Sequence, residues 1–225
     1  MSIGTIDSLM PVSISVSNTA SAQDAVDATN FTFSTQALGA AHTQRKIAVA
    51  IASNSSSSGR TISSVTVGGV SATSIISADG GSTSTNIAAI YLASVPTGTT
   101  GDVVVSHSAG MGNCSISLYR LIGASSTAHD TGSDIALTGN ALSDTMNVVS
   151  QGVLIACVDW LGNGAARTTT WTGPTEDVDE TIEGNFTYSS ASKLYVTTQT
   201  GITITATASG TLTAAALAIA SFKPV

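Results

Sequence analysis

The acidic residues of the chain gather in one segment. Five of the fourteen acids lie within eight positions, in Glu176–Glu183 (EDVDETIE). Clustered carboxylates suit a hard cation such as calcium, and two carboxylates placed roughly 5–9 Å apart across a cleft suit glycoside hydrolysis. A third interpretation needs no chemistry, because a charged, solvated strand and loop resists pairing with other strand edges. We favour the third, with calcium ahead of catalysis.

Two tryptophans bracket the loop at 161–170, in a chain of which only 4% is aromatic. If Trp160 and Trp171 are exposed, they can stack on a sugar ring together with Tyr188 or Tyr195. If they are buried, they cap the ends of a hydrophobic core, which is the usual use of a large rigid side chain. Trp160 and Trp171 are thus the candidate glycan contacts, and burial in a core is the simpler interpretation.

The remaining chemistry-bearing residues carry no motif. His42, His107 and His129 show no metal-ligand spacing. No G-x-S-x-G element supplies a nucleophile, and Gly68–Gly69 lacks the lysine of a phosphate-binding loop. We therefore predict no catalytic residue, no metal site, no cofactor and no enzymatic activity.

The two cysteines lie inside apolar runs that we expect to form strands. Cys114 and Cys157 are therefore predicted to be buried free thiols and not the basis of a disulfide framework.

The composition indicates β-sheet and excludes several classes of partner. Charged residues make up 9% of the 225 residues, whereas the chain has 34 Ser and 33 Thr. With a net charge of −7 and seven scattered Lys and Arg, it cannot neutralise a phosphate backbone, so we expect no nucleic acid partner. No apolar stretch approaches the roughly 20 residues of a membrane span. The first 18 residues lack a basic region and a continuous apolar run, so we expect no signal peptide.

Short apolar runs at regular spacing, without helical crossovers, predict an all-β fold: an antiparallel β-sandwich over residues 26–225. The run Arg45–Asn54 places large side chains (Ile47, Val49, Ile51) on one face and alanines on the other. Because both faces are apolar, we expect this strand to be central and covered on both sides, with a subunit contact as one way to cover it.

The strand pattern of the sequence runs twice through the chain. Arg45–Asn54 is echoed by Gln151–Trp160, Gly101–Gly110 by Gly201–Gly210, and Cys114–Gly123 by Thr213–Phe222. These echoes predict two pseudo-repeated halves, at about 30–123 and 134–223, in a jelly-roll-like sandwich. Two tandem sandwiches are the alternative, but no flexible linker at 123–143 separates the halves, so we favour one fused body.

Residues 1–25 precede the repeats and are predicted to form an N-terminal arm. Its Val12, Ile14 and Val16 alternate with serines, which is the period of a strand with one apolar face. These three residues are the candidate arm contacts, and the strand can cover an edge of its own sheet or of a neighbouring subunit's sheet.

Three segments carry a resemblance: Ile62–Ile75 (ISSVTVGGVSATSI), Ala89–Thr97 (AIYLASVPT) and Gly101–Val105 (GDVVV). They resemble Ser/Thr/Gly-rich β-sandwich proteins of tailed bacteriophages and of bacterial extracellular repeats. The resemblance covers about residues 30–223 and implies a virion component, such as a capsid decoration or cement protein, a head spike or a tail-tip part. It supplies no catalytic residue.

The function expected from these observations is structural. The chain would bind the outside of a bacteriophage capsid as a decoration protein, with the major capsid protein or other virion proteins as partners. It would self-associate, with a trimer as the working form, and be made in the host cytoplasm. The alternative is a carbohydrate-binding adhesin or receptor-binding module that contacts a host-surface glycan through the 160–172 loop. A hydrolase centred on the acidic segment is the third hypothesis.

Overall fold

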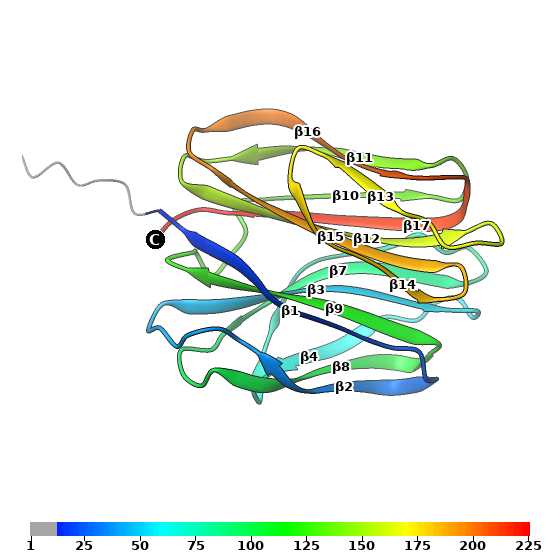
Figure 1. Ribbon diagram of the computed structural model, residues 1–225, viewed down its shortest axis with the longest axis horizontal. Coiled ribbons are helices and arrows are strands. Elements are labelled where there is room, and N and C mark those ends of the chain that lie inside the picture. Colours follow the sequence, from blue (N-terminus) through cyan, green and yellow to red (C-terminus); the bar gives the residue numbers. More distant parts are fainter. Residues whose placement is uncertain (1–12) are drawn as a thin grey trace, which may run out of the picture.

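The computed structural model describes residues 13–225, which form 17 β-strands in four antiparallel sheets and no helix. The sheets are stacked as four layers (Figure 1). We call them outer sheet 1, inner sheet 1, inner sheet 2 and outer sheet 2, in the order of the stack. The all-β antiparallel sandwich prediction is confirmed. Within the described residues, no helix has the length and apolar character needed to cross a membrane.

The first half of the chain forms two of the layers. Inner sheet 1 has the order β1 (Ser15–Asp24), β9 (Asn113–Ile122), β3 (Arg45–Ser55), β7 (Thr85–Ser94) and β6 (Thr73–Asp79). Outer sheet 1 has the order β2 (Ala28–Ala37), β8 (Thr100–Met111), β4 (Ile62–Val67) and β5 (Val70–Ser71).

The second half forms the other two layers. Inner sheet 2 has the order β10 (Asp130–Ala136), β17 (Leu212–Phe222), β12 (Gly152–Gly162), β15 (Phe186–Tyr195) and β14 (Thr175–Glu183). Outer sheet 2 has the order β11 (Ala141–Val148), β16 (Gln199–Ala208) and β13 (Thr169–Thr172). The strand orders of the two halves correspond position by position, except that β5 has no counterpart. The jelly-roll form stays a prediction.

Two of the three sequence echoes are misaligned by one residue. The first echo aligns Ile47 with Val153. The Ile47 side chain faces outer sheet 1, whereas the Val153 side chain faces the opposite inner sheet, so the two positions are not equivalent. The echo of Gly101–Gly110 likewise matches buried Val103 with exposed Thr203. Since side chains alternate along a strand, a shift of one residue exchanges the two faces.

The hydrophobic core consists of three clusters, one between each pair of neighbouring layers. On β3, Ile47, Val49 and Ile51 pack against outer sheet 1, while the alanines between them pack against inner sheet 2. All of these side chains are fully buried. The prediction that this strand is central and covered on both faces is confirmed, and the cover comes from the chain itself.

The two inner sheets approach each other closely because alanines line both of them. Ala48, Ala50 and Ala52 of β3 belong to the same cluster as Ala216, Ala218 and Ala220 of β17. Two tyrosines then bridge the layers: Tyr119 Oη donates to Ser190 Oγ (2.8 Å) and Tyr188 Oη donates to the Ala50 carbonyl (3.2 Å). The two sandwiches are therefore one packed body.

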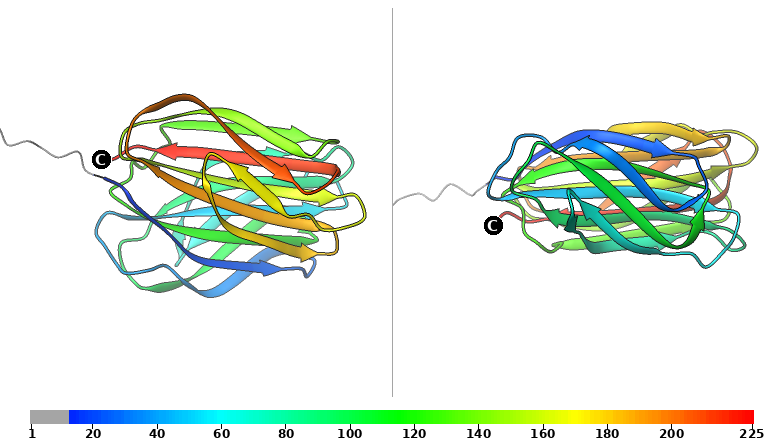
Figure 2. Two further views of the ribbon diagram at one scale, coloured as in Figure 1. Left: turned by 45° about the horizontal axis from the view of Figure 1, so that its top comes forward. Right: turned by 90° about the horizontal axis from the view of Figure 1, so that it is seen from below.

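The inner sheets lie against each other with their strand orders reversed. At one side β6 contacts β10, and at the other side β1 contacts β14. The second contact includes a hydrogen bond from Ser21 Oγ to Glu180 Oε1 (2.9 Å). Figure 2 shows the stacked sheets from two further directions.

The predicted N-terminal arm is built into the fold from residue 13 onward. Ser15–Asp24 forms β1, which pairs with β9 at the edge of inner sheet 1. Ile14 is buried in the cluster between the inner sheets and Val16 packs against that cluster, whereas Val12 lies outside the described residues. Of the two roles open to the arm, the structure shows that β1 covers an edge of its own sheet.

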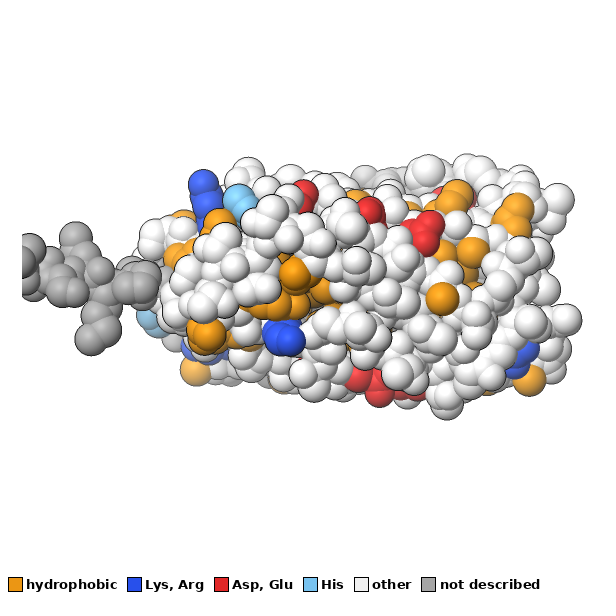
Figure 3. All heavy atoms as spheres, turned by 90° about the horizontal axis from the view of Figure 1, so that it is seen from above, with side chains coloured by type: hydrophobic (Ala, Val, Ile, Leu, Met, Phe, Trp, Pro, Cys, Tyr) orange, Lys and Arg blue, Asp and Glu red, His pale blue; other side chains and the backbone are white. Residues whose placement is uncertain are grey.

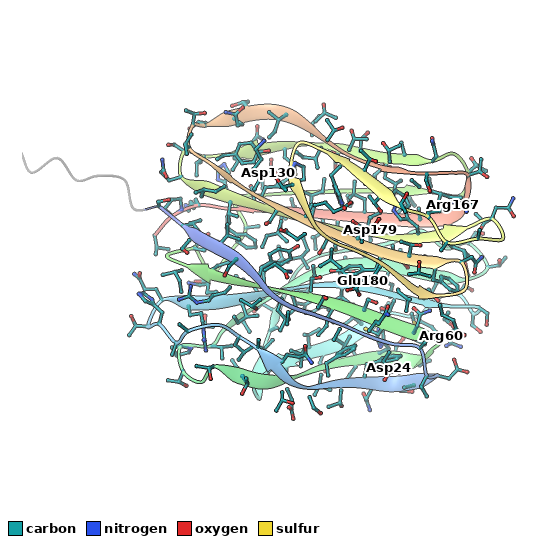
Figure 4. The ribbon with its side chains drawn as sticks, in the orientation of Figure 1. Asp24, Arg60, Asp130, Arg167, Asp179 and Glu180 are labelled. Atoms are coloured by element: carbon teal, nitrogen blue, oxygen red, sulfur yellow. The ribbon has the colours of Figure 1, made fainter. Side chains whose placement is uncertain are left out.

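Aspartate side chains form hydrogen bonds between the edge strands β10 and β11, which meet at one side of the second sandwich. Asp130 and Asp134 of β10 accept hydrogen bonds from backbone N–H groups of β11 (2.7 and 2.8 Å). Asp144 of β11 accepts one in return from the Ser133 N–H of β10 (2.8 Å). Figure 4 shows Asp130 at this side. The carboxylates thus accept hydrogen bonds from backbone N–H groups that an edge strand would otherwise leave unpaired.

A buried arginine ties loops together at the end of the first sandwich that also holds the C-terminus. The Arg45 side chain is 1% exposed, and its guanidinium donates five hydrogen bonds of 2.6–3.3 Å to backbone carbonyls of two loops. The acceptors are Leu38, Gly39, Val95, Thr97 and Gly98. Two of these hydrogen bonds, to Val95 and Leu38, are buried and the other three are part-buried, so the five guanidinium donors satisfy carbonyls that water reaches incompletely.

We predict that Arg45→Met destabilises the protein by about 3 kcal/mol or more, because buried carbonyls lose their donors while the apolar stem is retained. The free energy of unfolding measured by urea denaturation checks this. Arg60→Gln is the control, since the Arg60 guanidinium forms no hydrogen bond within residues 13–225. Equal effects of the two substitutions would contradict the role assigned to Arg45.

Candidate functional site

A hollow of about 720 Å³ opens on one side of the first sandwich, between strands β4 and β5 of the outer sheet and β6 and β7 of the inner sheet. Its volume lies in the range of small-molecule sites, which is roughly 300–1,000 Å³. Apolar side chains contribute much of its lining, among them Ile62, Val65 and Ile87. The Tyr91 side chain also lines it and is itself mostly buried.

Polar groups complete the lining. One cation, Arg60, and one carboxylate, Asp79, belong to it. The serine hydroxyls come from β4, β5 and β6: Ser63, Ser64, Ser71, Ser74 and Ser77. An apolar surface with a few polar groups around it is the usual composition of a ligand site.

The hairpin between β4 and β5 shapes this hollow. Gly68 and Gly69 make its turn with φ angles of 56° and 78°, in the left-handed region that glycine adopts without strain. The second sandwich has no strand equivalent to β5. On its corresponding side, the Trp171 indole packs against the core and donates from Nε1 to Ser189 Oγ of β15 (2.8 Å). The same strand arrangement therefore carries a tryptophan in one half and a hollow in the other.

Arg60 differs from most of the other basic residues in its surroundings. The side chains of Arg45, Lys46, Arg120, Arg167 and Lys193 all donate hydrogen bonds to backbone carbonyls. Arg60 is held through its backbone N–H, which donates to Thr85 Oγ1 (3.2 Å). Its guanidinium is therefore available to a ligand.

The Asp79 carboxylate is oriented by the backbone around it. Its Oδ1 accepts hydrogen bonds from the N–H groups of Gly81 (3.0 Å) and Asn86 (2.9 Å). Its second oxygen, Oδ2, accepts none within the described residues, so it can accept from a ligand. Two backbone donors on one oxygen fix the carboxylate without neutralising its charge.

A second, smaller hollow of about 290 Å³ adjoins the first. Its lining includes Asp27, Ser55, Ser56 and the backbone at Gly110 and Gly112. Arg60 belongs to the lining of both hollows. The two hollows therefore have Arg60 in common.

The tryptophans proposed as glycan contacts lie elsewhere. Trp160 is fully buried between the sheets of the second sandwich, and its Nε1 donates to Thr169 Oγ1 (2.9 Å). A sugar ring cannot reach it, so the interpretation as a core residue is correct for Trp160. Trp171 is half-buried against the same core. A glycan contact by the rest of its ring stays a prediction.

The acidic segment forms β14, which is the last strand of inner sheet 2. Val178 and Ile182 point into the core between the inner sheets, while the acids go to different partners. Asp179 Oδ2 accepts from the Thr169 N–H (3.0 Å), and Glu180 Oε1 accepts from Ser21 Oγ (2.9 Å) (Figure 4). The segment is a charged edge strand.

The histidines and cysteines are dispersed. His42 and His129 are exposed, whereas His107 is buried, with Nε2 3.0 Å from Ser53 Oγ. In the described part of the chain, no three His, Cys, Asp or Glu side chains gather in a way that could hold a metal ion. Cys114 and Cys157 are free and buried, as predicted. Burial raises the pKa of both thiols, that of Cys157 to about 12.

One buried ionisable group is not among the residues predicted from the sequence, although it lies inside an apolar run. Asp159 is fully buried on β12 at the contact between the inner sheets, and its Oδ2 accepts from Asn86 Nδ2 (3.3 Å). Its Oδ1 has no hydrogen-bond partner within the described residues. Burial, together with the charge of Asp79, raises the pKa of Asp159 to about 8.

This raised pKa makes stability depend on pH. The folded protein keeps the Asp159 proton up to about pH 8, whereas the unfolded chain releases it near pH 4. The contribution of protonated Asp159 to the free energy of unfolding is therefore complete below about pH 4 and is lost as the pH rises through about 8. We predict that Asp159→Asn removes this loss, which has a slope of at most about 1.4 kcal/mol per pH unit.

Denaturant unfolding of both proteins from pH 5 to 8.5 checks the prediction, with the difference between the two curves widening as the pH rises. His107, whose pKa burial lowers to about 4, titrates in both proteins and cancels in the difference. Parallel curves over this range would show that Asp159 is ionised in the folded protein.

Comparisons of the chain with protein-family models, with curated proteins and with solved structures found no match.

Proposed function

We propose that this chain is a structural protein of a tailed-bacteriophage virion, which binds the outside of the capsid as a decoration protein. The resemblance to Ser/Thr/Gly-rich virion proteins supports this proposal. The segments that carry it form β4 to β6, β7 with the turn that follows, and the first part of β8. All of these segments belong to the first sandwich.

The observation that carries the proposal is the packing of four sheets into one body with outer faces rich in hydroxyl groups. On β16, Ile204 and Ala206 point into the core, while Thr203 is exposed and Thr205 half-exposed. The face of outer sheet 2 in Figure 3 is mostly uncharged, with a few scattered charges and apolar groups. Such a surface can pack against another protein with little cost for desolvating charges.

The start of β1 and the C-terminus lie at the same end of this body. β1 begins beside the C-terminus (Figure 1), and the last residues are fixed there by a hydrogen bond from the Val225 N–H to the Gly123 carbonyl (3.0 Å). We propose that the protein attaches to the capsid through this end. The partners would be the major capsid protein or other virion proteins, and copies would assemble as a homo-oligomer, with a trimer as the working form.

We predict that deleting residues 1–12 abolishes or strongly weakens binding to capsids and leaves the fold intact. The deleted stretch ends before buried Ile14 and before β1. Binding is measured by co-sedimentation with capsids, where the full chain should sediment in a fixed stoichiometry. Folding is measured by circular dichroism with thermal melting. Full binding by the shortened protein would refute attachment through this segment.

A longer deletion serves as the contrasting control. Removing residues 1–25 also removes β1, exposes the paired edge of β9 and takes Ile14 out of the core. We expect this variant to lose stability by several kcal/mol. Its failure to bind would therefore report on folding and not on attachment.

A further inference from the structure

We infer that the hollow between β4, β5, β6 and β7 binds a neutral saccharide, with Arg60 and Asp79 as the residues that fix the sugar hydroxyls. This inference concerns a site that the virion proposal does not require. A sugar ring presents apolar C–H faces and a rim of hydroxyl groups, so its site must offer an apolar surface together with both donors and acceptors.

The lining of the hollow meets both requirements. Ile62 and Ala72, which are half-buried, and the exposed edge of Tyr91 supply the apolar surface against which a ring face can pack, while Val65 and Ile87 lie buried beneath it. Tyr91 is 7% exposed and belongs to the core between the sheets of the first sandwich. Its ring is therefore held in place before a ligand arrives, which lowers the entropic cost of binding.

The hydrogen-bonding groups are complementary and prearranged. The guanidinium of Arg60 can only donate, and Oδ2 of Asp79 can only accept. Within residues 13–225 neither the Arg60 guanidinium nor Asp79 Oδ2 has a hydrogen-bond partner, while Asp79 Oδ1 is held by two backbone N–H groups. Hydrogen bonds that involve a charged group are the stronger ones. A hydroxyl between them could accept from one and donate to the other.

Charge balance selects the class of saccharide. Arg60 and Asp79 carry opposite charges, so the lining of the larger hollow has no net charge. The adjoining hollow adds the carboxylate of Asp27, and the chain as a whole carries −7. Uronic or sialic acids would meet no excess of positive charge and would be repelled by this field. The site therefore favours neutral sugars.

The two hollows indicate a ligand longer than one ring. Their linings share Arg60, so a chain of two or more sugar units could occupy both, with Arg60 contacting both parts of it. In Figure 4, Arg60 lies toward the end of the body opposite to the C-terminus. A protein held at its terminal end would present this site outward.

The test uses the full chain on an array of neutral and acidic oligosaccharides, followed by calorimetric titration of a bound neutral glycan. Arg60→Gln removes the charged donor without breaking a protein hydrogen bond. Asp79→Asn keeps an acceptor for the two backbone N–H groups and turns the free oxygen into a donor. We expect each variant to bind about tenfold or more weakly, with unchanged melting temperature. Lys223→Gln makes the same change of net charge as Arg60→Gln, at the exposed C-terminal segment, and should bind like wild type.

Several results would overturn the inference. They are binding of acidic glycans alone, no binding of any neutral glycan, and neutral-glycan binding that survives both Arg60→Gln and Asp79→Asn. The outcome is independent of the virion proposal, because both variants should still co-sediment with capsids. Loss of glycan binding with retained co-sedimentation separates the two functions.

Discussion

The close contact between the two alanine-lined inner sheets is the constraint on which the rest of the structure depends. Short side chains let the layers approach until Tyr188 Oη reaches a carbonyl of the opposite sheet. Such a contact tolerates little increase in volume, because tightly packed interiors have no room for added methylene groups. It also explains why β3 is apolar on both faces, since each face belongs to a different core.

The few cations serve mainly to stabilise backbone. Arg45 and Arg167 each bind a set of carbonyls where loops converge, and aspartates bind backbone N–H groups between β10 and β11. Charged side chains thus replace the strand partners that turns and sheet edges lack. Arg60 and Asp79 stand apart because each keeps hydrogen-bonding capacity that the described chain does not use.

The sequence predicted which segments form strands better than it predicted which side chains of those strands are buried. The alternation around Ile47 correctly predicted a central strand, but the echoes at Gln151 and Gly201 were misaligned by one residue, because abundant Ala, Ser and Thr make neighbouring registers look alike. In β14, a bulge between Glu176 and Val178 obscured the inward positions. Asp159, inside the apolar run of β12, was the available sign of a buried acid. The hollow had no such sign, because it arises from how two sheets diverge around an added hairpin.

The reversed stacking of the inner sheets has a consequence for assembly. Since β1 meets β14 while their topological equivalents β10 and β6 meet each other, the strand contacts between the halves follow the pattern of a two-fold dimer. An isologous contact of this kind is closed, because each half contacts the other through the same surface. None of that surface remains free to bind a third sandwich. Covalent linkage makes this pairing intramolecular and thus independent of protein concentration. Any larger assembly must therefore grow from surfaces other than the contact that joins the two halves.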